Sequence, residues 1–158
     1  MSLPVISVGQ MREWEQATWA TGQAEAEVIR RVGQAVAQRV LQLTRPNDLI
    51  LLLAGKGHNG DDVRAAQPHL ANRRCELLEV ISPPVGHAQL NEALARQPAL
   101  VVDGLFGIGL NRPLDADWLQ LITTLIPPTP KCWPWMCLRA WTRIQARTLA
   151  RPCGRTSR

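Results

Sequence analysis

Two glycine-rich segments of this 158-residue chain hold most of the residues that could do chemistry. The first, Gly55-Lys56-Gly57-His58-Asn59-Gly60-Asp61-Asp62, follows an apolar run and has the spacing G-x-G-x-x-G. Glycines at this spacing let backbone N–H groups approach a pyrophosphate at a helix N-terminus. The second segment, Gly104 to Pro113, follows Asp103 at the end of another apolar run. A core strand has little use for a charge, so Asp103 is a candidate ligand or catalytic group.

The acidic residues of these segments leave several interpretations open. Asp61 and Asp62 would repel an anionic pyrophosphate, so their cluster with His58 and Asn59 suits a cation or sugar hydroxyls better. Alternatively, either aspartate stabilises the first turn of a helix by offsetting its dipole. For Asp103 the alternative is an Asx turn that caps the strand. The first segment is not a P-loop, because no Lys-Ser or Lys-Thr closes it.

The position of Glu79 is compatible with a different class of enzyme, the NAD-dependent dehydrogenases. Glu79 lies about twenty residues beyond the glycines, where a dehydrogenase places the acid that binds the ribose. An NAD-dependent oxidoreductase with a Rossmann G-x-G-x-x-G loop is therefore the alternative enzyme. A non-catalytic nucleotide-binding remnant is the third possibility, and ligand binding without turnover would identify it.

Alternating strands and helices must position both segments. Continuous apolar runs predict strands at Leu49–Ala54, Cys75–Ile81 and Leu100–Asp103. Helices are expected at Met11 to about Ala20, Glu25–Leu43, Asp61 to about Arg73, Gln89–Arg96 and Asp115–Ile126. This alternation predicts an α/β fold with a mostly parallel, three-layer α/β/α arrangement. Ligands of such sheets bind beyond the carboxyl ends of the strands, where both glycine-rich segments fall.

The same segments resemble motifs of the NAD(P)H-hydrate epimerase family, the YjeF N-terminal domain family. Leu53 to Asp62 is similar to its G-x-G-N-N-G-G-D-G loop, and Val102 to Pro113 to its V-D-A-L-F-G-T-G-L-x-R-P loop. The resemblance covers roughly residues 8–130, includes Arg12 and Glu15, and implies a Rossmann-like sheet. Asp61 and Val63 stand where the family has glycine, so side chains replace bare backbone where substrate should approach.

The resemblance implies an isomerase that interconverts the R and S hydrates of NADH or NADPH. A companion ADP- or ATP-dependent dehydratase, separate or fused, would then restore the cofactor, and a homodimer is compatible with the resemblance. Asn59 and Asp103 would help hold a potassium ion, while the catalytic residue is left unassigned. The positions that would contact substrate are His58, Asn59, Gly60, Asp61, Asp62, Gly107, Ile108, Gly109, Leu110, Asn111, Arg112 and Pro113.

Residues 131–158 differ from the rest of the chain in composition. They hold seven basic residues and no acidic one, whereas residues 1–130 hold 11 basic and 13 acidic residues. The formal charge of +5 thus belongs to this tail, and no nucleic-acid partner is expected. The spacing of Cys132, Cys137 and Cys153 is typical neither of a zinc site nor of a disulfide framework.

A shifted reading frame would explain the tail. The family's next motif, V-D-x-P-S-G, is absent after Pro130. Reading from the third base of the Lys131 codon permits V-L-A-x-D-V-P-S-G-L-D-A-D-T-G, with the decoded Asp at Met136 and the decoded Ser at Arg139. We therefore expect a hydrate-epimerase domain at 1–130, a frame-shifted, non-native tail at 131–158, and a sheet incomplete at its C-terminal side. Little or no epimerase activity is expected from this chain.

Membrane insertion and export are not indicated. No apolar run has the eighteen or so residues that a membrane helix needs. The N-terminus lacks the charged start and apolar stretch of a secretory signal. We expect a single cytoplasmic domain without a membrane partner.

Overall fold

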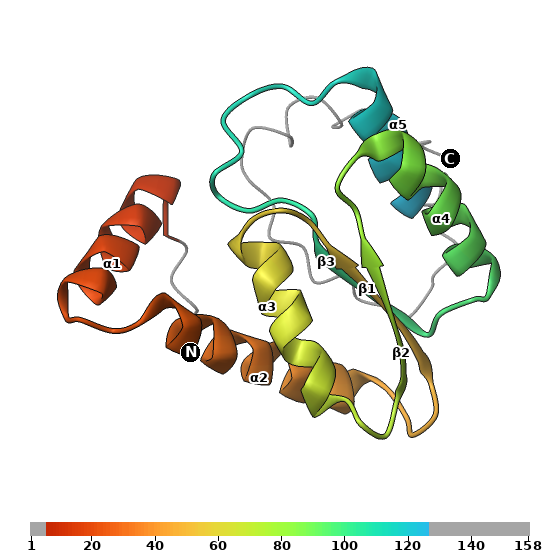
Figure 1. The fold of residues 1–158 in the computed structure, drawn as a ribbon, viewed down its shortest axis with the longest axis horizontal. Coiled ribbons are helices and arrows are strands. Elements are labelled where there is room, and N and C mark those ends of the chain that lie inside the picture. Colours follow the sequence, from red (N-terminus) through yellow and green to blue (C-terminus); the bar gives the residue numbers. More distant parts are fainter. Residues whose placement is uncertain (1–5, 127–158) are drawn as a thin grey trace, which may run out of the picture.

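The computed structural model describes residues 6–126, so the expected tail at 131–158 lies outside the described residues. Within that range a parallel sheet of order β2-β1-β3 carries helices on both faces (Figure 1). The predicted three-layer α/β fold is confirmed. The strands are β1 (Leu49–Ala54), β2 (Arg74–Glu79) and β3 (Leu100–Gly104). The helices are α1 (Val8–Ala20), α2 (Glu25–Leu43), α3 (His58–Ala66), the 3-10 turn η1 (Gln67–His69), α4 (Pro83–Ala95) and α5 (Ala116–Leu125).

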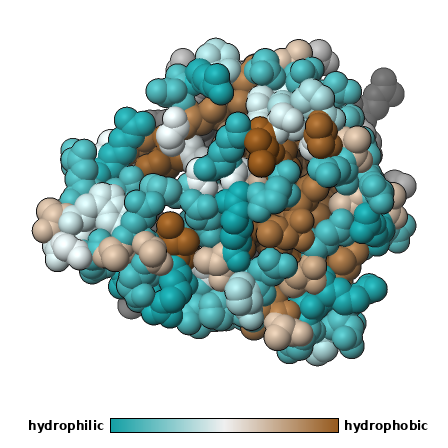
Figure 2. All heavy atoms as spheres, in the orientation of Figure 1, coloured by the Kyte–Doolittle hydropathy of each residue, from teal (hydrophilic) through white to brown (hydrophobic). Residues whose placement is uncertain are grey.

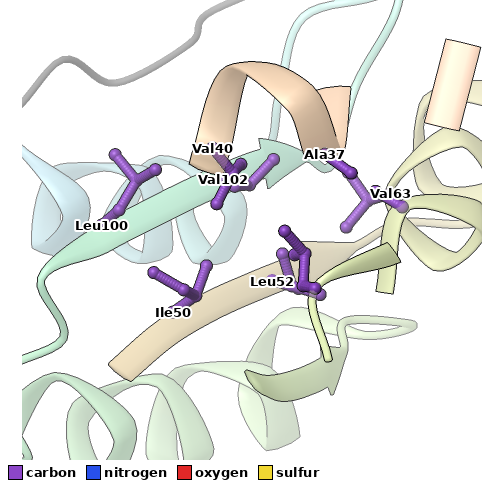
Figure 3. Packing of buried hydrophobic residues seen from close by; sticks show 9 residues of the cluster. Ala37, Val40, Ile50, Leu52, Val63, Leu100 and Val102 are labelled. Atoms are coloured by element: carbon purple, nitrogen blue, oxygen red, sulfur yellow. The ribbon is translucent and has the colours of Figure 1, made fainter. Parts of the chain in front are cut away.

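The central strand β1 contributes side chains to two hydrophobic cores. Successive side chains of a strand point to opposite faces, so Ile50 and Leu52 enter one core and Leu51 and Leu53 the other. The first core lies under α2 and α3, as Figure 3 shows for residues including Val40 and Val102. The second lies under α4 and α5. On the face shown in Figure 2, hydrophobic residues gather near the middle of the molecule and hydrophilic residues surround them.

Several boundaries differ from the expectation. α1 begins at Val8 instead of Met11, and the side chain of Ser7 caps it. β2 ends at Glu79 instead of Ile81. α3 begins at His58 instead of Asp61, so the glycine-rich segment is partly helical. It ends at Ala66, and Pro68 lies in η1 instead of the interior of a long helix. Proline lacks an N–H and clashes with the preceding turn, which explains the early end. α4 begins at Pro83 instead of Gln89, since proline is favoured at the first helical position.

α1 and β3 lie at the margins of the described fold. α1 buries none of its residues and stands away from the sheet in Figure 1. Among the strands of residues 6–126, β3 pairs with β1 alone, so it forms one edge of the described sheet. No helix in this described part is long and apolar enough to span a membrane.

Candidate functional site

A cavity of about 780 Å³ lies beyond the carboxyl ends of the three strands. The loop after β1 and the first turn of α3 contribute Lys56 to Asn59, and the residues that follow β2 contribute Val80 and Ile81. The loop after β3 contributes residues 105–115, while Trp118 comes from α5 and Arg12 and Glu15 from α1. Segments that are distant in sequence therefore meet at the predicted edge of the sheet.

The residues predicted to bind substrate or potassium divide into two groups. His58, Asn59 and residues 107–113 all line the cavity. Gly60, Asp61, Asp62 and Asp103 do not belong to its lining. Gly60 is buried behind the loop, and the two aspartates lie further along α3. The structure thus brings the exposed part of the first motif together with the second motif.

Asn59 joins the two motifs directly. Its Nδ2 donates a hydrogen bond of 2.6 Å to the carbonyl of Phe106. Gly107 lies against the same amide, because a Cβ added there would be 3.1 Å from Asn59 Oδ1. With the amide nitrogen committed to Phe106, Oδ1 is the atom through which Asn59 could bind a cation.

Asp103 lies near the end of β3, just before the second loop. The N–H of Leu105 donates to Asp103 Oδ1 over 3.0 Å. This is the Asx turn expected as the alternative role of Asp103. A Cβ added at the next residue, Gly104, would lie 2.6 Å from the carbonyl oxygen of Asn59, so the two loops touch through their backbones as well. Within residues 6–126 no group of three His, Cys, Asp or Glu side chains could hold a metal ion.

The wall of the cavity is partly aromatic. Phe106 and Trp118 pack edge to face, with ring centroids 4.8 Å apart and an interplanar angle of 70°. Val80 and the exposed Ile81 extend this apolar wall. Sequence reasoning missed Trp118, Val80 and Ile81 as site residues. The rule that ligands bind beyond strand ends would have found the two that follow β2, whereas Trp118 depends on how α5 packs.

Basic side chains also face the cavity. Arg12, Lys56 and Arg112 line it, and within the described residues none of the three takes part in an ion pair. The lining holds three basic and two acidic residues, although acidic residues outnumber basic ones over residues 1–130. The cavity is therefore more positive than the domain that contains it, which favours an anionic ligand.

Known proteins resemble this chain in sequence. NAD(P)H-hydrate epimerase of Achromobacter xylosoxidans is 36% identical over 142 residues, which cover 77% of this chain and 66% of that protein. The enzyme of the same name from Bordetella pertussis is 35% identical over 139 residues, covering 76% and 59%. This chain belongs to the NAD(P)H-hydrate epimerase family. It spans less than two thirds of the length of these two relatives. No family model matches the chain.

A solved structure agrees with the fold of the family. The crystal structure of the yeast protein YNL200c has a TM-score of 0.60 to this chain at 18% identity, covering 78% of this chain and 65% of the yeast one. At that identity the likeness concerns the fold. The predicted Rossmann-like arrangement of the epimerase family is thereby confirmed.

The two departures from the epimerase family's first loop are accommodated outside the cavity. Asp61 pairs with Arg64, their Oδ1 and Nη1 atoms being 2.8 Å apart. Val63 is buried in the first core, where its Cγ2 lies 2.6 Å from the position of a Cβ at Gly104. Neither side chain belongs to the cavity lining, so the expected obstruction of substrate is absent from the described lining.

Glu79, the residue on which the oxidoreductase alternative depends, is engaged by another partner. Arg64 Nε donates to its Oε1 over 2.9 Å, and Arg64 Nη2 donates to its Oε2. The hydrogen bonds from this guanidinium lower the pKa of Glu79. Glu79 does not line the cavity. Its contacts therefore favour a role in the protein framework over one in binding a ribose.

The carboxyl group of Asp62 should make the free energy of unfolding depend on pH. Burial raises its pKa from 3.8 to about 6, which outweighs the lowering effect of His58. The folded state thus binds this proton more tightly than the unfolded state, so stability falls as pH rises from about 4 to about 6 and stays lower above that. We expect Asp62→Asn to stabilise the protein at pH 7.5 by about 1 kcal/mol, because partial solvent exposure screens the full effect.

Urea denaturation at pH 7.5 and at about pH 3, below both pKa values, measures this effect. The gain should vanish at the lower pH, where both states are protonated. Asp117→Asn, which removes an exposed carboxylate in the first turn of α5, is the control. An equal gain at both pH values would show that the charge of Asp62 is not the cause.

Proposed function

We propose that the cavity binds hydrated NADH or NADPH and that the complete domain interconverts their R and S forms. The observation that carries this proposal is the Asn59–Phe106 hydrogen bond, which joins the two family motifs across one cavity. An aromatic wall suits the flat rings of a dinucleotide, and the basic side chains of Arg12, Lys56 and Arg112 suit its phosphates. The family membership supports the reaction, since the relatives named above are NAD(P)H-hydrate epimerases.

A potassium ion is part of this proposal. Asn59 Oδ1 and the Asp103 carboxylate would hold it, and hard oxygen atoms are suitable ligands for such a cation. Bound there, the ion would supply fixed positive charge beside the substrate. The chain's own residues do the rest: Asn59 ties the loops together, and the apolar wall excludes water from one side of the substrate.

A dehydratase would act on the product. The bifunctional NAD(P)H-hydrate repair enzyme of Synechocystis is 29% identical over 141 residues, and the match covers 26% of that protein. Its name says that two repair functions share one chain, which supports a second repair enzyme as partner. We propose that this protein is cytoplasmic, that a dehydratase, fused or separate, consumes a hydrate that this site would supply, and that the domain is compatible with a homodimer.

The activity is tested by following the exchange of separated R and S hydrates by chromatography. Two proteins are compared: the 158-residue chain and a version whose frame is restored from the third base of the Lys131 codon. We expect the restored protein to accelerate exchange and to lose that acceleration when sodium replaces potassium. The 158-residue chain should show little or none. Exchange by neither protein would contradict the proposal, and full activity in both would contradict the expected inactivity of the 158-residue chain.

The cations of the cavity give a second test. Lys56→Gln and Arg112→Gln should each weaken binding of NADPH hydrate roughly tenfold, because each removes a charge that would contact phosphate. Arg45→Gln is the matched control, since Arg45 is an exposed cation outside the cavity lining. Titration of the purified protein by calorimetry measures the affinity. Equal affinities for all three variants would show that the cavity does not recognise phosphate through these residues.

A further inference from the structure

Arg64 contacts three segments with a single guanidinium. Its Nη1 donates to Asp61 Oδ1 over 2.8 Å on its own helix, α3. Its Nη2 donates to the carbonyl of Gly55 over 2.9 Å, at the start of the loop after β1. Its Nε and Nη2 both donate to Glu79 at the end of β2. The planar fork of arginine suits such multiple contacts, and a lysine could make only some of them.

Hydrogen bonds fix both the N–H and the carbonyl of Gly55. Its N–H donates to the carbonyl of Gly104 at the end of β3, over 3.1 Å. Its carbonyl accepts from Arg64. The four residues that follow, Lys56 to Asn59, all line the cavity. The orientation of Gly55 therefore sets the direction in which this loop leaves the sheet.

We infer that Arg64, held by Glu79, is a positioning residue that orients the Lys56–Asn59 segment of the cavity, which is the loop after β1 and the start of α3. Arg64 does not line the cavity, so it acts through the Gly55 carbonyl and not by touching a ligand. Its effect on ligand affinity rests on the proposed function, whereas its effect on the loop does not.

The solvent exposure of the Arg64–Glu79 pair argues against a purely stabilising role. The side chains of Arg64 and Glu79 are 32% and 42% exposed, and ion pairs at that exposure add little to global stability. Loss of the pair should therefore loosen the loop while the fold persists. The pKa of Glu79 is lowered and that of Arg64 raised by their mutual hydrogen bonds, so both stay charged near neutral pH.

Hydrogen exchange of the 158-residue chain tests the inference. The amides of Gly60 and Asp61 report on the loop, because both donate to the carbonyl of Gly57. Arg64→Gln and Glu79→Gln should each accelerate their exchange roughly tenfold, and the double variant should add little to either. Arg64→Lys should restore part of the protection. Arg96→Gln is the matched control, since Arg96 pairs with Glu76 and Glu92 away from the cavity.

Two further measurements complete the test. Midpoints of urea denaturation should change no more in Arg64→Gln than in Arg96→Gln, whereas the affinity for NADPH hydrate should fall about tenfold in Arg64→Gln and stay unchanged in Arg96→Gln. Unchanged exchange at Gly60 and Asp61 in both Arg64→Gln and Glu79→Gln would overturn the inference. Accelerated exchange in a protein that binds no hydrate in any form would uphold the positioning role and reject the proposed function.

Discussion

Gly60→Ala should destabilise the protein by about 3 kcal/mol or more, although alanine is the better helix former. Gly60 lies in the first turn of α3, and a Cβ there would sit 2.1 Å from the carbonyl oxygen of Gly55. That carbonyl cannot easily move, because it accepts a hydrogen bond from Arg64 and the N–H of the same residue donates to the carbonyl of Gly104. Helix propensity alone predicts a gain of about 1 kcal/mol, so the two arguments differ in sign.

Gly57→Ala in the same loop is the matched control. No heavy atom lies within 4 Å of a Cβ at Gly57, and its φ of −102° suits any residue. We expect this variant to stay within about 1 kcal/mol of the parent in urea denaturation. Equal stabilities for the two alanine variants would show that the close approach of Gly60 to Gly55 is not required.

Asn59→Asp should have the second largest effect. The change is nearly isosteric, but an ionised carboxylate cannot donate to the Phe106 carbonyl that Asn59 contacts at 2.6 Å. Two acceptors then face each other in a half-buried site, which costs about 2 kcal/mol of folding free energy. If the two loops form the proposed site, the affinity for NADPH hydrate should also fall by at least about tenfold.

The pH dependence of this variant identifies the cause. A protonated carboxyl can donate again, so the loss should shrink as pH falls toward the ordinary aspartate pKa of about 3.9. Asn91→Asp on α4 is the control, because Asn91 is exposed and its contact with His87 is 3.5 Å long. Urea denaturation at pH 7.5 and 4.5 compares the variants. A loss in Asn59→Asp that is independent of pH would contradict the role of the Phe106 hydrogen bond.

Both motifs of the site can be recognised from the sequence, but the sequence does not show which of their residues line the cavity. The resemblance predicts substrate contacts at every position from His58 to Asp62. In the structure His58 and Asn59 line the cavity, whereas Gly60 packs against Gly55 and Asp61 pairs with Arg64. Helix α3 starts three residues before the expected position, and this turns the later motif residues away from the cavity.

The amino-acid sequence by itself determined the strands and their parallel arrangement. The apolar run of β1 and the strand–helix alternation are local patterns, and burial on two faces leaves a parallel sheet as their natural outcome. Only the tertiary structure decided what Arg64 does, because its partners Gly55 and Glu79 are separated along the chain and meet through strand pairing. It also brought Arg12, Lys56 and Arg112 to one cavity, since no local pattern encodes which distant loops share a sheet edge.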